Sequence, residues 1–143
     1  MRQSLVFNQM YENSLASIEP TIEFDVSKVK SDVFLKVVDW CEQHEGRPVP
    51  TVEVDPHTRE RRWFTFDEYE KEFFKLPVEA LEEVLMAANF LDIPSLYLCG
   101  CQAMAAVIKD KSPEEIRSLL GLPDDLTDEE KDAIRKENIW CSQ

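Results

Sequence analysis

The segment from residue 77 to residue 141 decides the fold, because it joins apolar helical stretches with clear helix start signals. Its first stretch ends in Ala87-Ala88-Asn89-Phe90-Leu91-Asp92-Ile93. Further on, Ser112-Pro113-Glu114-Glu115 and Thr127-Asp128-Glu129-Glu130 are two capping boxes, the first with proline at the first helical position. Gly121 and Pro123 separate the two helices that these boxes begin. The pattern predicts a series of short helices.

Two of these predicted helices are too apolar to face solvent on all sides. On the helix over residues 77–91, Leu81, Leu85 and Ala88 share one face. The helix over residues 93–108 carries Leu96, Ala103 and Val107 on one side, and Tyr97, Gly100, Cys101, Met104 and Ile108 on the other. A helix that is apolar all round is buried all round, either inside a bundle or with a partner against one face. The apolar faces alone favour helices that are buried inside a bundle of this chain. Methionine and aromatic side chains, however, also suit an adaptable interface with a partner.

The N-terminal half mixes shorter elements. Residues 1–19 suggest one short helix or strand, and Thr21–Val26 alternates apolar and polar residues, which predicts a half-buried strand. Ser27 is expected to cap a helix over residues 28–44 that ends at Gly46. Residues 46–63 are expected to form a loop with a basic cluster at Arg59, Arg61 and Arg62.

The segment over residues 67–75 is rich in phenylalanine and tyrosine, and a helix is expected to follow from Pro77. Asp92 is expected to cap the next helix, whose first turn contains Pro94. The chain closes on Trp140-Cys141. A terminal aromatic side chain usually needs a pocket, so this tail is expected to dock on its own domain or on a partner.

Composition excludes several functional classes. The 143 residues are 43% apolar, enough for one domain with a core, and the formal net charge is −13. Such a charge argues against partners made of nucleic acid or anionic membrane. No apolar run approaches the ~20 residues of a membrane span, and the N-terminus lacks the features of a secretory signal. We therefore expect four reduced cysteines in a cytoplasmic and nuclear protein.

Few residues could support catalysis. Three glycines are too few for a phosphate-binding loop. Cys41 and His44 share a helix face and could form half of a metal site or a thiol–base pair. A structural zinc site needs a second pair of ligands, and a lone cysteine is commonly a small core residue. We expect no enzyme activity, no cofactor, no metal and no small-molecule substrate. An enzyme that uses Cys41 and His44 is the less favoured alternative.

Three ordered motifs carry a family resemblance: residues 87–93, residues 108–117 and the Trp140-Cys141 close. Together they resemble the C-terminal region of the S-phase kinase-associated protein (Skp) family, the adaptors of SCF-type ubiquitin ligases. Residues 34–41, which end in Trp40-Cys41, are similar to a further helix of that family.

The resemblance implies an α+β, mostly helical fold. It divides the chain into a partial BTB/POZ-like region over residues 1–63, the remaining BTB/POZ-like helices over 64–110, and dimerisation or F-box-binding helices over 111–143. In this family the BTB/POZ domain binds a cullin scaffold, and the C-terminal helices bind the F-box of a substrate receptor. The implied function is that of an adaptor that performs no chemistry and supports protein ubiquitination and degradation.

The resemblance also implies site residues. Asn89 and Phe90 match an Asn-Tyr pair on the cullin-facing side of the family. The expected F-box-binding residues are Leu81, Leu85, Tyr97, Met104, Ile108, Ile116 and Trp140.

Two departures from the family qualify this interpretation. The chain starts near the family's first helix, so the opening strand pair of the BTB sheet is expected to be missing. The central loop, acidic in the family, contains Arg59, Arg61 and Arg62. These two departures affect the predicted cullin-binding half of the chain more than the predicted F-box-binding half. The alternative is therefore a module that binds F-box proteins, does not engage cullin and sequesters the receptors.

Overall fold

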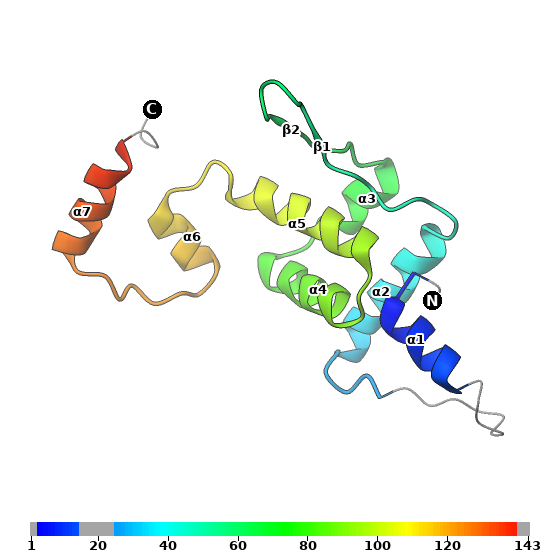
Figure 1. The fold of residues 1–143 in the computed structure, drawn as a ribbon. Helices are drawn as coiled ribbons and strands as arrows, with labels where there is room; N and C mark the ends of the chain where they lie inside the picture. Colours follow the sequence, from blue (N-terminus) through cyan, green and yellow to red (C-terminus); the bar gives the residue numbers. More distant parts are fainter. Residues whose placement is uncertain (1–2, 15–24, 140–143) are drawn as a thin grey trace. The chain divides into compact units, whose positions relative to one another are not determined.

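The structure, a computed structural model, describes residues 3–14 and 25–139. The chain divides into two compact units, Met1–Asp110 and Lys111–Gln143. Among the described residues, the first unit holds five helices and a two-stranded antiparallel sheet, and the second holds two helices (Figure 1). The prediction of a mostly helical α+β fold is confirmed.

The elements follow one another in a simple order. In the first unit these are α1 (Leu5–Ser14), α2 (Ser31–Gln43), β1 (Glu53–Val54), β2 (Arg61–Arg62), α3 (Glu68–Phe73), α4 (Val78–Phe90) and α5 (Pro94–Ile108). The second unit contains α6 (Pro113–Leu119) and α7 (Asp128–Glu137).

The core of the first unit lies where α2, α4 and α5 meet, and Trp40 is at its centre. Trp40 is completely buried, its ring stacks on His44 with 3.8 Å between centroids, and it also contacts Phe73 and Phe74. Its indole N–H donates to the Ser95 hydroxyl over 3.1 Å. The fully buried large aliphatic residues around this centre are Val37, Leu81, Val84, Leu91, Ile93 and Leu96.

Gly100 lets α4 and α5 approach closely. A Cβ at this position would lie 2.7 Å from Leu85 Cδ2 and 3.2 Å from Leu85 Cγ. Leu96 and Ala103 are buried on α5, whereas Tyr97 on the same helix is exposed. The predicted all-round apolar helix is therefore covered on one side by its own domain and remains partly open on the other.

Ser4 fixes the start of α1 to the turn between α4 and α5. Its buried hydroxyl donates to the Leu91 carbonyl and accepts from the backbone N–H of Phe7 over 3.2 Å. Beside it, the Leu5 N–H donates to the Asp92 carbonyl over 3.0 Å. The predicted short element near the N-terminus is thus a helix, and it is docked on the α4–α5 turn.

Ser4→Ala is expected to lower the free energy of unfolding by about 1–3 kcal/mol, because it removes a helix cap and a buried hydrogen bond to Leu91. Urea denaturation followed by circular dichroism measures the change. Ser14→Ala is the control, because the hydrogen bond from the Ser14 hydroxyl to the Met10 carbonyl is exposed to solvent. Its expected change is within about 0.5 kcal/mol. Equal changes in both variants would mean that the Ser4 contact does not hold α1.

Two predicted helix caps are wrong. Ser27 does not cap α2, because residues 26–29 form a turn in which the Val29 N–H donates to the Val26 carbonyl over 2.8 Å. The N-cap is Lys30. Asp92 does not cap α5 either, since it occupies the left-handed region (φ 49°) and Ile93 is the N-cap. The position of Pro94 in the first turn of α5 is confirmed.

The loop predicted over residues 46–63 contains a hairpin instead. Glu53 pairs with Arg62 and Val54 with Arg61. The connecting turn forms because the Asp55 carboxylate accepts from the backbone N–H groups of His57 (2.8 Å) and Thr58 (2.9 Å). The strand predicted at Thr21–Val26 lies mostly outside the described residues, and its last two residues, 25 and 26, are not in a strand.

In the second unit the predicted caps are confirmed. Ser112 with Glu115 and Thr127 with Glu130 each form a complete capping box. Gly121, in the left-handed region at φ 62°, lies between the two helices. A third capping box, which Asp67 and Glu70 form at the start of α3, was not predicted.

Candidate partner-binding surfaces

The C-terminal end of α4 exposes the two residues predicted to face a cullin. Asn89 is exposed, and Phe90 has 37% of its surface exposed. Each lines a separate hollow of about 340 Å³. We call the first the Phe90 groove; it is lined by Lys28, Val29, Lys30, Val33, Glu82, Glu83, Met86, Ala87 and Phe90. The second, the Asn89 pocket, is lined by Ala88, Asn89, Asp92, Ile93, Pro94, Tyr97 and Leu98.

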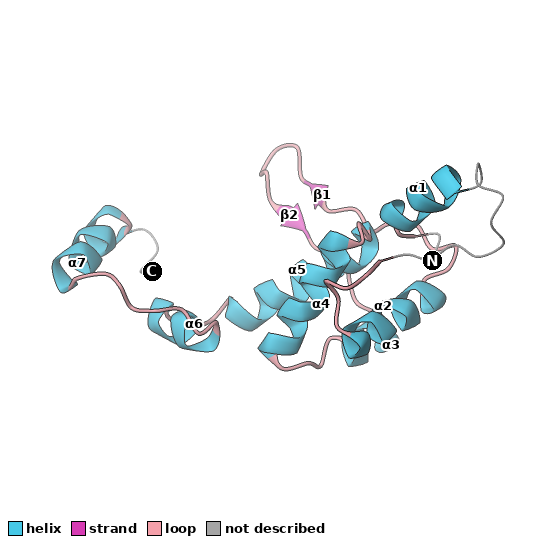
Figure 2. Ribbon diagram, turned by 90° about the horizontal axis from the view of Figure 1, so that it is seen from below, coloured by secondary structure: helices cyan, strands magenta, loops and turns pink. Residues whose placement is uncertain are grey.

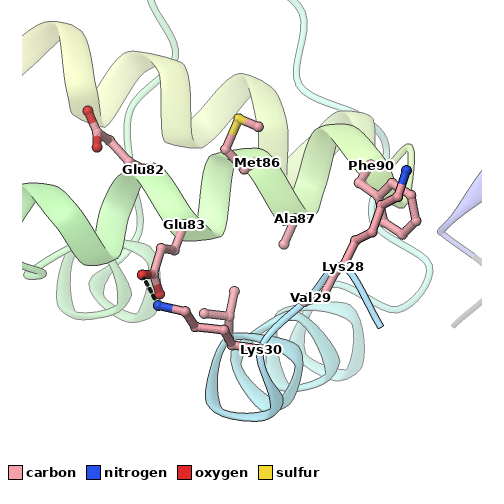
Figure 3. A pocket seen from close by; sticks show the side chains of 9 residues that line it. Lys28, Val29, Lys30, Glu82, Glu83, Met86, Ala87 and Phe90 are labelled. Atoms are coloured by element: carbon pink, nitrogen blue, oxygen red, sulfur yellow. Dashed lines mark hydrogen bonds and ion pairs between the residues drawn. The ribbon is translucent and has the colours of Figure 1, made fainter. Parts of the chain in front are cut away.

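The Phe90 groove runs between the N-terminal end of α2 and the outer face of α4 (Figure 3). At one end the Lys28 ammonium lies over the Phe90 ring, 5.5 Å from its centroid, which is a cation–π distance. At the other end the Lys30 ammonium pairs with the Glu83 carboxylate at 2.5 Å. Met86 lies between these ends with 70% of its surface exposed. The groove therefore combines a charged rim with an apolar surface that suits apolar side chains of a partner.

Met86 was missed by the sequence analysis. The signal was present, because Glu82, Met86 and Phe90 are spaced by four residues and so share a line along α4. The apolar face predicted for this helix was instead the one that carries Leu81, Leu85 and Ala88, which is the opposite, inward face. A large apolar side chain that is most exposed on a helix with a well-buried stripe is a candidate contact residue.

The Asn89 pocket brings together residues that were assigned to different partners. Tyr97, predicted to bind an F-box, lines this pocket with Asn89, predicted to bind a cullin. The pocket is formed at the α4–α5 turn, which the hydrogen bonds from Ser4 and Leu5 hold in place. The two predicted surfaces therefore meet at this turn.

The remaining predicted F-box residues differ in exposure. Leu81 is completely buried and presents no surface to a partner, so in this structure it supports α4 from inside the core. Leu85 is half-buried where it packs on Gly100, and Met104 and Ile108 are half-buried on α5. In the second unit, Ile116 is half-buried on α6. Trp140 lies outside the described residues. The binding roles of these residues stay predictions.

Cys41 and His44 are built into the core. Burial raises the pKa of the Cys41 thiol, which lowers the fraction of the nucleophilic thiolate. His44 lies with Nδ1 3.0 Å from the Trp40 carbonyl and Nε2 3.0 Å from the Glu70 carboxylate. The Nε2 contact joins the C-terminal end of α2 to α3, whereas the Nδ1 contact stays within the last turn of α2. No cluster of three or more potential metal ligands occurs in the part of the chain that the structure describes.

Over the described ranges 3–14 and 25–139, none of the helices has the length and apolar character needed to span a bilayer.

Comparison with known proteins identifies the family. Residues 94–141 match the dimerisation domain of the Skp1 family. An E3 ubiquitin ligase complex SCF subunit, sconC of Arthroderma benhamiae, is 39% identical over 141 residues, which cover 99% of this chain and 84% of that protein. The chain belongs to the Skp1 family.

Two other relatives cover similar shares of the chain. Suppressor of kinetochore protein 1 of Schizosaccharomyces pombe is 35% identical over 94% of this chain and 84% of that protein. A homologue of S-phase kinase-associated protein 1 from Tetrahymena thermophila is 34% identical over 95% of this chain and 82% of that protein. The Skp resemblance indicated by the three sequence motifs is confirmed, and the Skp1-family match runs from α5 to beyond α7.

Proposed function

We propose that this Skp1-family protein is a non-catalytic adaptor of an SCF-type E3 ubiquitin ligase and joins a cullin scaffold to F-box substrate receptors. The observation that carries the proposal is the 39% identity over nearly the whole chain to an SCF subunit. The structure supports it with exposed apolar surface at the end of α4 and on α5, the kind of surface that marks protein–protein contacts.

The cullin-binding surface is proposed to centre on Asn89 and Phe90. The two side chains line neighbouring hollows, so a partner helix that crosses the end of α4 could place one side chain in each. Exposed Met86 extends the apolar contact along α4. Buried aromatic anchors at the centre of an interface commonly dominate its binding energy.

The F-box-binding surface is proposed to use Leu85, Met104 and Ile108 in the first unit, with Ile116 and Trp140 from the second. Leu81 is proposed to act indirectly, because it is buried beneath α4. Tyr97 lines the Asn89 pocket and is proposed to lie where the two partners come closest.

Met104→Ala combined with Ile108→Ala is expected to weaken binding of an F-box fragment about tenfold, because two apolar contacts are shortened. Isothermal titration calorimetry gives the affinity. Binding of a cullin N-terminal domain to the same variant should change less than about twofold, and this serves as the internal control. An unchanged F-box affinity would remove this side of α5 from the proposed surface.

Ligase activity tests the function itself. In a mixture of ubiquitin, its activating and conjugating enzymes, a cullin–RING pair and a full-length F-box receptor, ubiquitin conjugates on the receptor are expected only when this chain is added. The same mixture without the F-box receptor is the control for conjugation elsewhere. Receptor conjugates that form equally well without the chain, or fail to form with it, would contradict the adaptor function.

A further inference from the structure

The β1–β2 hairpin separates its side chains by charge between two faces. Directly opposed residues of an antiparallel pair lie on the same face, and faces alternate along each strand. Val54 therefore shares a face with Arg61, and Glu53 shares the other face with Arg62. The Asp55 N–H donates to the Glu60 carbonyl over 2.9 Å, which continues the pairing toward the turn.

This alternation places every acidic residue of the hairpin on one side. Glu53, Asp55 and Glu60 fall on the face of Arg62. On the opposite face, the same alternation groups Arg61 and Val54 with Trp63 and Val52 of the adjoining residues. We call this second group the Arg61 face. It carries one cation, a large aromatic residue and two valines, and it lacks a carboxylate from the hairpin itself.

The Arg61 face is open to solvent. Trp63 has 53% of its surface exposed, and both Val54 and Arg61 are exposed. Within the described ranges, no ion pair involves the Arg61 guanidinium. The hairpin extends away from the helices of the first unit (Figure 2). Its base is held there, because the Gln102 side chain donates to the Phe64 carbonyl over 2.7 Å.

We propose that the Arg61 face binds an acidic segment of a partner protein, with a carboxylate on Arg61 and an adjacent apolar side chain against Trp63 and Val54. Charge complementarity selects this occupant. The chain carries a net charge of −13, so an acidic ligand is repelled by the chain as a whole and is attracted where a cation stands clear of neighbouring carboxylates. Arginine pairs with carboxylates through two parallel hydrogen bonds, and tryptophan adds a large apolar contact at low entropic cost. The proposal is independent of the adaptor function.

Two substitutions on one strand test the proposal. The probe is a short fluorescein-labelled peptide that alternates glutamate and leucine, followed by fluorescence anisotropy. Arg61→Gln should weaken its binding roughly tenfold, and Trp63→Ala should weaken it similarly. Arg62→Gln removes the same charge from the same strand on the other face, and it should change affinity less than about twofold. Backbone amide NMR signals of β1 and β2 establish that the hairpin persists in each variant.

Three results would overturn the proposal. These are no detectable binding of the acidic peptide, equal weakening by Arg61→Gln and Arg62→Gln, and equal binding of a peptide with glutamine in place of glutamate. Equal weakening would mean general electrostatic attraction instead of recognition by one face. Equal binding of the glutamine peptide would mean that the carboxylate is not recognised.

Discussion

Trp40→Ala is expected to lower the free energy of unfolding by about 3–5 kcal/mol. Trp40 is completely buried, and its removal would leave a cavity bordered by His44, Phe73 and Phe74. The substitution also removes the donor that pairs with the buried Ser95 hydroxyl. Because small domains are stable by only about 5–15 kcal/mol, this loss would remove a large part of the total. Urea denaturation followed by far-ultraviolet circular dichroism measures it.

The same substitution at Trp63 is the matched control. Trp63 has 53% of its surface exposed, so Trp63→Ala should cost about 1 kcal/mol or less. If Trp40→Ala and Trp63→Ala lowered the free energy of unfolding by similar amounts, the position of Trp40 at the centre of the core would be contradicted. If Trp40→Ala is too unstable to purify, Trp40→Phe replaces it. This variant keeps an aromatic ring and loses the hydrogen bond to Ser95. Its expected loss is about 1–3 kcal/mol.

Asn89→Lys combined with Phe90→Lys is expected to weaken binding of a cullin N-terminal domain about 30-fold or more. The change removes a central aromatic contact, which is commonly worth about 2 kcal/mol in an interface. The Phe90→Lys change also places a second ammonium group beside that of Lys28, which in the unchanged protein lies over the Phe90 ring. The fold should persist, because both replaced side chains are exposed. Surface plasmon resonance with immobilised cullin domain gives the affinity.

A control with the same added charge separates contact from electrostatics. Gln9→Lys with Met10→Lys places two ammonium groups on neighbouring exposed positions of α1, where Met10 is 38% exposed, close to the 37% of Phe90. Cullin affinity should change less than about threefold in this variant. F-box binding should be unchanged in both. If the Asn89 and Phe90 changes weaken both partners to the same extent, the assignment of separate surfaces is wrong.

The sequence predicted best where the physical cause is local. Ser112 and Thr127 were assigned correctly as caps because a capping box needs only residues three apart. Ser27 and Asp92 have the right chemistry for caps but take part in turns instead. The Ser27 turn is closed locally, by the Val29 N–H that donates to the Val26 carbonyl. Asp92 is held at the α1 junction through the Leu5 N–H, and no local pattern reveals that contact.

Two features could not be predicted from the periodicity of apolar residues along the sequence. Each strand of the hairpin is only two residues long, too short for an alternating pattern to be recognised. A stripe of apolar residues also cannot show which side of a helix is covered. Leu81 was predicted to face a partner and is buried in the core, whereas Met86, on the outer face of α4, is the most exposed of the large apolar side chains described.

The mass of a reconstituted complex tests the adaptor function most directly. This chain, an F-box fragment and a cullin N-terminal domain are mixed and separated by size-exclusion chromatography with multi-angle light scattering. The account predicts one species with the mass of all three components, and no joint species when this chain is omitted. A binary complex with the F-box fragment that never takes up cullin would contradict it and favour a protein that sequesters receptors.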